Sequence, residues 1–124
     1  ICYEIIYSGK IKKNNKDFDL ILNISEDGWF GETVGPYQHF THSIFRSIEE
    51  GKTLLRSANN GISAVIDPIN GVIDSVNLKK KGVISLNSIK IYNNTLFSIY
   101  GNKIFFYLMI FYISFIFILK RKDL

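Results

Sequence analysis

The chain has 124 residues, enough for about one small domain, and its formal net charge is +4. Residues 1–102 contain eleven Lys or Arg and ten Asp or Glu, whereas residues 103–124 contain four basic residues and one acid. The basic excess therefore belongs to the C-terminal tail, which argues against a nucleic-acid-binding surface. Cys2 is the only cysteine, so an internal disulfide is excluded.

The first stretch holds the only thiol of the chain. Residues 1–6 read Ile-Cys-Tyr-Glu-Ile-Ile, a pattern that predicts a short buried strand ending in a turn at residues 7–9. Side chains two residues apart lie on the same face of a strand, so we expect Cys2 and Glu4 to share one environment. Taken alone, a single cysteine is more often a small buried hydrophobic residue than a nucleophile. Because the chain begins within this strand, we expect it to be the C-terminal fragment of a longer protein.

A strand, a loop and a helix are predicted next. Residues 18–25 are a nearly continuous apolar run, typical of a strand covered on both faces. The loop of residues 26–36 places three glycines around Trp29 and Phe30, two large side chains that need a pocket to fill or to line. A helix is predicted from Pro36 to about Gly51. Its apolar side chains predict one buried stripe, formed by Phe40, Ile44, Phe45 and Ile48.

The following residues predict more strands. Residues 53–58 form one strand, and residues 62–67 and 72–76 form a hairpin joined by Pro-Ile-Asn-Gly. Residues 82–89 predict one further strand, and the three lysines before it predict a solvated turn. The domain is therefore predicted to be a layered α/β structure.

Several polar side chains stand out within these elements. His39 and His42 have a helical spacing that can bind a metal, but no further ligands accompany them, so we expect no metal and a structural hydrogen bond from His39. Arg46 and Glu49, three residues apart, are expected to pair on the helix. Arg56 lies in an apolar strand and needs a buried partner or a polar cavity; Glu49 or an upstream acid is a candidate partner.

The C-terminal segment differs from the rest. Residues 104–119 contain no charge, and Ser114 is the only small polar residue among them. A membrane helix is predicted over residues 99–119, with Lys103 extending its amine to the interface; a buried core helix is the alternative. The basic residues 120–122 should stay cytoplasmic by the positive-inside rule, which places residues 1–98 on the opposite side of a bacterial inner membrane.

With these stretches in hand, the sequence resembles the apolipoprotein N-acyltransferases, membrane-embedded members of the nitrilase superfamily. The resemblance follows the family order over nearly the whole chain, except that Glu26 stands where Asn is expected and residues 79–91 match little. The motifs that carry it are Ile1-Cys2-Tyr3-Glu4, Asp27-Gly28-Trp29-Phe30-Gly31, Gly35-Pro36-Tyr37-Gln38-His39-Phe40, Arg46-Ser47-Ile48-Glu49, the stretch Arg56 to Asp67, and the terminal apolar segment.

The resemblance implies the C-terminal part of a nitrilase-type αββα sandwich followed by one transmembrane helix. It also implies an acyl transfer without cofactors, from a phospholipid donor to the N-terminal amine of a diacylglyceryl-cysteine apolipoprotein, through a thioester on Cys2. Glu4 would support catalysis by orienting its neighbours. From the residues themselves, Tyr3 is expected either to form a wall of the substrate pocket or to be a core aromatic. Trp29 and Phe30, in a Gly-rich loop, suit either a mobile lid that contacts the lipid substrate or ordinary anchors of the loop. The catalytic glutamate and lysine of the family lie upstream, so we expect this fragment to be inactive alone.

Two other functions fit the same residues. One is a membrane-tethered nitrilase-type amidohydrolase, with water as the acceptor of the acyl group. The other is a non-catalytic, membrane-anchored nitrilase-like domain.

Overall fold

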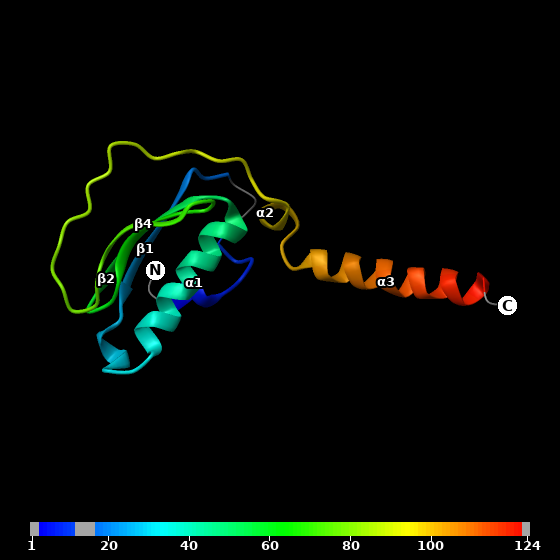
Figure 1. The fold of residues 1–124 in the computed structure, drawn as a ribbon, viewed down its shortest axis with the longest axis horizontal. Coiled ribbons are helices and arrows are strands. Elements are labelled where there is room, and N and C mark those ends of the chain that lie inside the picture. Colours follow the sequence, from blue (N-terminus) through cyan, green and yellow to red (C-terminus); the bar gives the residue numbers. More distant parts are fainter. Residues whose placement is uncertain (1–2, 12–16, 123–124) are drawn as a thin grey trace.

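The computed structural model describes residues 3–11 and 17–122, which form a mixed α/β domain followed by a long C-terminal helix (Figure 1). Cys2 lies outside the described residues. The α/β class expected from the sequence is confirmed. In chain order the elements are η1 (Tyr3–Ile6), β1 (Leu20–Glu26), η2 (Gly28–Phe30), α1 (Gly35–Glu50), β2 (Thr53–Asn59), β3 (Ser63–Asp67), β4 (Gly71–Val76), α2 (Leu96–Tyr100) and α3 (Lys103–Lys122).

The four strands form one sheet in the order β1-β2-β3-β4. β1 and β2 run parallel, in a register that places Asn23 beside Arg56, whereas β2, β3 and β4 are antiparallel neighbours. Parallel neighbours need a crossover connection, and α1 supplies it between β1 and β2. The predicted hairpin is confirmed, because β3 and β4 pair directly and are joined by the turn at residues 68–70.

The apolar core lies between α1, η1 and one face of the sheet. Half-buried side chains of α1, Phe40 and Ile44, pack against it. The buried members of this cluster are Ile5, Ile21, Leu54, Ala64 and Ile66.

β1 is covered on one face only. Its burial alternates strictly: Asn23 and Ser25 are buried, whereas Leu22 and Ile24 are 61% and 52% exposed. The prediction of a strand covered on both faces is therefore wrong for the described residues. The reason is that α1 packs on a single side of the sheet, and the buried side of β1 carries the polar residues.

α1 has the predicted ends but a different buried face. Pro36 lies in its first turn, and Gly51 ends it in a left-handed conformation with φ 65°, which glycine adopts without steric cost. Phe45 and Ile48 are about half exposed, so the predicted apolar stripe is wrong in these two members. The fully buried side chains of α1 are mostly polar, because this face meets the polar side of β1 and β2: His39, Ser43, Arg46, Ser47 and Glu50.

The first described residues coil into the short helix η1 and do not form the predicted strand. Only Ile5 is buried, while Tyr3 and Glu4 are exposed. The prediction that Cys2 and Glu4 share one face is not tested, because Cys2 lies outside the described residues.

Residues 77–95 contain neither helix nor strand, so the strand predicted over residues 82–89 is wrong. This segment pairs with no sheet edge and is held near its end by the side chains of Lys52, just before β2, and of Asp67 on β3. The Lys52 amine donates to the Tyr92 carbonyl at 2.6 Å, and the Tyr92 hydroxyl donates to Asp67 at 2.6 Å. The exposed turn predicted at the three lysines is confirmed.

α3 projects away from the sheet and α1 (Figure 1). Over Lys103–Arg121 its mean hydropathy is 1.9 and no residue is buried, so by length and composition it is the one helix among the described residues able to cross a membrane. The described part of the chain does not bury α3, which does not support the alternative of a buried core helix. α3 begins at Lys103, and Gly101, with φ 55°, separates it from α2, so residue 99 of the predicted membrane span lies in α2.

Candidate active site

A group of buried polar side chains lies between α1 and the sheet, and we call it the polar layer. Each of its residues is at most 5% exposed. Burial of so many polar groups is favourable only where they bind one another. The polar layer consists of Asn23, Ser25, Asp27, His39, Ser43 and Arg56.

β1 and the residue that follows it supply three members of the polar layer. Asn23, Ser25 and Asp27 alternate with exposed residues and share the face that meets α1, as strand periodicity requires. Asp27 continues this alignment beyond the strand, where its backbone N–H binds the Asn59 carbonyl at 3.0 Å. The alternation delivers the polar side chains to α1 and leaves Leu22 and Ile24 on the other face.

Arg56 of β2 is the central cation of the polar layer. Its Nη2 donates to Asp27 Oδ2 at 2.7 Å, and its Nη1 donates to Asn23 and, at 3.0 Å, to Ser43 Oγ. Its Nε donates to the Ile62 carbonyl at 3.2 Å. The predicted need for a buried partner is confirmed, but the partner is Asp27 and not Glu49, which instead pairs with Arg46 at 2.8 Å as predicted.

Asp27 accepts hydrogen bonds from three groups of the polar layer. Ser25 Oγ and His39 Nδ1 each lie 2.8 Å from Oδ1, and Arg56 binds Oδ2. Gly61 lies so close to this carboxylate that a Cβ there would be 2.2 Å from Oδ2. The close approach explains why glycine is needed in this turn.

His39 makes the predicted structural hydrogen bond, through Nδ1 to Asp27. Its ring centroid lies 5.5 Å from that of Tyr3 and 5.7 Å from that of Phe30. Its second ring nitrogen, Nε2, is buried and has no hydrogen-bond partner among the described residues. The ring is therefore bound on one side to the polar layer and bordered on the other by aromatic side chains.

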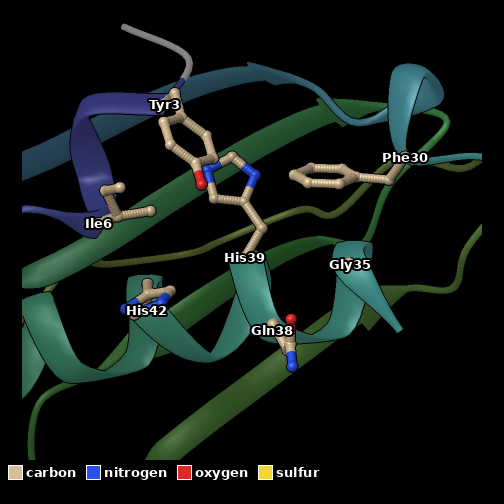
Figure 2. A pocket seen from close by; sticks show the side chains of 7 residues that line it. All are labelled: Tyr3, Ile6, Phe30, Gly35, Gln38, His39 and His42. Carbon is tan, nitrogen blue, oxygen red and sulfur yellow. The ribbon is translucent and has the colours of Figure 1, made fainter. Parts of the chain in front are cut away.

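A cavity of about 180 Å³ adjoins His39, and Figure 2 shows the imidazole between the rings of Tyr3 and Phe30. Trp29 is 66% exposed and packs edge-on against Tyr3, with ring centroids 5.8 Å apart. The cavity therefore lies where η1, η2 and the start of α1 meet. Its lining consists of Tyr3, Ile6, Phe30, Gly35, Gln38, His39 and His42.

The loop before α1 is fixed to the end of β2 through Glu26. Its carboxylate accepts from the Asn59 amide at 2.5 Å and from the Gly28 N–H at 2.7 Å. These hydrogen bonds hold the pKa of Glu26 below its usual value, and the one from Asn59 has the largest effect. Glu26 thus positions the turn that carries Trp29 and Phe30.

Two of the three predicted substrate contacts, Tyr3 and Phe30, line the cavity, and Trp29 packs against both of their rings without lining it. Glu4 is exposed, and a hydrogen bond from its own backbone N–H lowers its pKa. A carboxylate with a lowered pKa is a weaker proton acceptor, which fits a supporting role better than that of a general base.

Sequence reasoning missed Asp27 and the polar layer. Two periodic signals could have revealed them: polar residues at every second position from Asn23 to Asp27, and a polar series on α1 that includes His39 and Ser43. Both patterns were obscured by the apolar residues that lie between the polar ones. Those apolar residues predicted that the opposite faces of β1 and α1 are buried.

Comparison with known proteins identifies the family of the chain. The model of the carbon-nitrogen hydrolase family matches residues 1–87. Proteins named apolipoprotein N-acyltransferase are 44% identical over 82% of this chain in Rickettsia prowazekii (strain Madrid E), 42% identical over its whole length in Rickettsia bellii (strain RML369-C), and 45% identical over 68% in Agrobacterium fabrum (strain C58 / ATCC 33970).

These matches span 21%, 25% and 16% of the three relatives, respectively, so the chain corresponds to about a fifth of their length. They confirm the resemblance to the apolipoprotein N-acyltransferases that the motifs indicated. The chain belongs to the carbon-nitrogen hydrolase family.

Proposed function

We propose that the chain carries the nucleophile and part of the substrate cavity of an N-acyltransferase, which moves a fatty acyl chain from a phospholipid to the N-terminal amine of a diacylglyceryl-cysteine apolipoprotein. One observation carries the proposal. The chain is similar to proteins named apolipoprotein N-acyltransferase, and its helix η1 begins at Tyr3, the residue after Cys2. The ring of Tyr3 packs against Trp29 and His39.

In the first half-reaction the Cys2 thiolate attacks the ester carbonyl carbon of the phospholipid. A C–S bond forms, and the carbonyl electron pair moves to oxygen. When the carbonyl re-forms, the C–O bond to the glycerol breaks, and the lysophospholipid leaves with a proton from a general acid. A thiolate suits this step because it is both a strong nucleophile and an adequate leaving group.

In the second half-reaction the α-amino group of the apolipoprotein attacks the thioester. A C–N bond forms, the C–S bond breaks to regenerate the thiolate, and the nitrogen loses a proton to a general base. The backbone N–H of Tyr3 is suited to bind the oxyanion in both halves. The base and a lysine that shares this oxyanion are, by resemblance to the family, residues outside this chain.

α3 supports a membrane location for this chemistry. Its 19 apolar-rich residues extend about 28 Å at 1.5 Å per residue, close to the ~30 Å hydrocarbon core. In this proposal α3 crosses the membrane, the basic residues 120–122 lie in the cytoplasm, and residues 1–98 lie on the periplasmic side. The cavity would then face the compartment in which lipoproteins present their N-termini.

The test uses the protein expressed from its complete gene, in membranes supplied with acyl-labelled phospholipid and a diacylglyceryl peptide. We expect a thioester-linked label on the protein, followed by an N-acylated peptide. Cys2→Ser should abolish both, because a serine hydroxyl is far less ionised than a thiol at neutral pH. Ser57→Ala on the exposed side of β2 serves as the matched control and should leave both signals unchanged.

Three outcomes would contradict the proposal. Full activity of Cys2→Ser would remove this residue as the nucleophile. Release of free fatty acid without acylated peptide would instead identify the amidohydrolase. The absence of any acyl-enzyme, in a protein that still binds lipid, would indicate the non-catalytic domain.

A further inference from the structure

One ring nitrogen of His39 lacks a partner although the residue is only 2% exposed. The other members of the polar layer have hydrogen-bond partners within the domain. Arg56, for example, donates to Asp27, Ser43, Asn23 and the Ile62 carbonyl. A buried polar atom without a partner costs free energy. Nε2 of His39 is therefore a candidate contact for a molecule that the domain binds.

The contacts of Nδ1 determine what Nε2 can do. Nδ1 of His39 lies 2.8 Å from Asp27 Oδ1 and 3.2 Å from Arg56 Nη2. A carboxylate paired with an arginine can only accept hydrogen bonds, so the shorter of these contacts assigns a proton to Nδ1. In the neutral imidazole this leaves a lone pair on Nε2. Nε2 is then a hydrogen-bond acceptor, suited to an N–H or O–H group and not to a carbonyl.

The surroundings of Nε2 narrow the class of ligand. The rings of Tyr3 and Phe30 flank the imidazole (Figure 2). A positively charged group placed over the face of either ring would be attracted by it. The charges of Asp27 and Arg56 offset each other within the polar layer, so nothing in it favours an anion. The cavity volume, about 180 Å³, is below the ~300 Å³ of a typical small-molecule pocket and suits a small group better than a fatty chain.

We propose that this cavity is a subsite for a primary amine of the substrate, which donates an N–H hydrogen bond to Nε2 of His39 while Tyr3 and Phe30 flank it. The subsite deepens the proposed acyl transfer and rests on it, because that reaction needs an amine as acceptor. His39 is a positioning residue here: it orients the nitrogen, and Asp27 orients His39. Tyr3 is 42% exposed, so this wall of the cavity is a surface side chain and not part of the buried polar layer.

Two substrates of the proposed reaction can supply such an amine. One is the α-amino group of the apolipoprotein, and the other is the headgroup of an ethanolamine phospholipid. A phospholipid with a glycerol headgroup has no amine, so a comparison of the two donors separates these sources.

The first experiment uses His39→Asn in the protein expressed from its complete gene. The asparagine amide can take the place of Nδ1 and keep the hydrogen bond to Asp27, but it has no atom at the position of Nε2. His39→Gln is the complementary variant, because its longer side chain returns a polar atom to that position. Thr41→Ala, on the exposed side of the same helix, is the control.

Acyl-enzyme formation is measured with ethanolamine and with glycerol phospholipids, and transfer to a diacylglyceryl peptide is measured separately. We expect His39→Asn to lower peptide transfer about tenfold, mainly through KM, and His39→Gln to restore part of the loss. If the loss appears only with the ethanolamine donor, the subsite holds the headgroup amine. Equal losses in every assay, or none, would overturn the subsite.

A second measurement needs no turnover. Binding of the diacylglyceryl peptide to the wild-type protein is compared with that of an analogue in which hydrogen replaces the α-amine. If the analogue binds the wild-type protein about tenfold more weakly than the peptide does, the result supports the subsite for the acceptor amine. If His39→Asn shows the same difference in binding between peptide and analogue, the result argues against the subsite. If the wild-type protein forms no acyl-enzyme, the proposed function fails, and this binding comparison decides on the subsite by itself.

Discussion

The polar layer and α3 both depart from the usual pattern of apolar side chains inside and polar side chains outside. The polar layer buries polar side chains, and α3 exposes apolar ones. In the polar layer, charged and polar residues are at most 5% exposed, whereas the apolar residues from Phe105 to Leu119 are 42% to 71% exposed. The polar layer is stable because nearly all of its donors and acceptors meet within it. α3 has no covering element among the described residues, and its composition suits a hydrocarbon solvent.

This comparison shows that burial follows the available partners more closely than it follows hydropathy. Arg56 is buried because Asp27, Asn23 and Ser43 lie within its reach. Substitutions that remove a hydrogen-bond or ion-pair partner should therefore strongly destabilise the polar layer. Substitutions that make a side chain of α3 polar should weaken its insertion into a membrane.

The largest effect is expected from Arg56→Met, which leaves Asp27 as an uncompensated buried charge. Removing one partner of a buried ion pair costs about 3–5 kcal/mol of unfolding free energy. Urea unfolding in detergent, followed by far-UV circular dichroism, measures the loss. Lys79→Met is the control, because it breaks the exposed pair with Glu32 and should change the unfolding free energy little. A loss for Arg56→Met no larger than that of the control would contradict the description of the polar layer.

A smaller effect is expected from Ile110→Arg near the middle of α3. An arginine at the centre of a membrane helix costs about 2.5–3.5 kcal/mol for insertion, which is roughly a hundredfold in the insertion equilibrium. Flotation of residues 96–124 fused behind a soluble reporter measures the membrane-bound fraction. Ile110→Leu should float like the wild-type segment, and equal flotation of the arginine variant would argue against a spanning helix.

Gly61→Ala tests the edge of the polar layer. The added methyl group would collide with the Asp27 carboxylate, and overpacking of this kind costs about 1–3 kcal/mol. The same urea unfolding experiment measures it. Asn60→Gly, in the same turn, should destabilise the domain less, because glycine adopts the positive φ of 56° at this position more easily and only the exposed side-chain hydrogen bond to Glu26 is lost. A neutral Gly61→Ala would mean that the carboxylate is free to move.

The smallest effect concerns Tyr92→Phe, in the segment between the sheet and α3. Burial alone would raise the pKa of Asp67, but hydrogen bonds from Tyr92 and from the backbone of Asn70 and Ile69, with the charge of Lys90, outweigh it and lower the pKa. A lowered pKa in the folded state gives stability that is present above the unfolded value, about 4, and is lost as pH falls through the folded value.

Tyr92→Phe should therefore be slightly less stable at pH 7 and should lose less stability below about pH 4 than the wild type. Unfolding midpoints between pH 7 and pH 3 measure the difference. An identical pH dependence in the two proteins would show that the Tyr92 hydroxyl does not stabilise the Asp67 carboxylate.

Local signals were sufficient for much of the fold. Pro36 and Gly51 mark the ends of α1 because proline suits a first helical turn and glycine a left-handed cap. The hairpin of β3 and β4 was predicted from its turn residues, and the Arg46–Glu49 pair from their helical spacing. These features depend on residues close together in the chain.

Features that depend on distant residues were predicted less well. The partner of Arg56 is 29 residues away, and it becomes a neighbour only because β1 and β2 are parallel. η1 was predicted as a strand because its apolar residues fit both periods over so short a stretch. The stripe on α1 was misjudged because the face that is buried depends on what the sheet presents to it.

The sequence by itself determined the α/β class, the ends of α1, the apolar character of α3 and the family resemblance, because composition, spacing and motifs are properties of neighbouring residues. Only the tertiary structure decided that the polar face of β1 is the buried one, that Asp27 binds Arg56 and His39, and that Tyr3 and Phe30 flank the imidazole. The physical reason is that a charged or polar side chain is buried only where partners exist, and those partners come from separate strands and a helix.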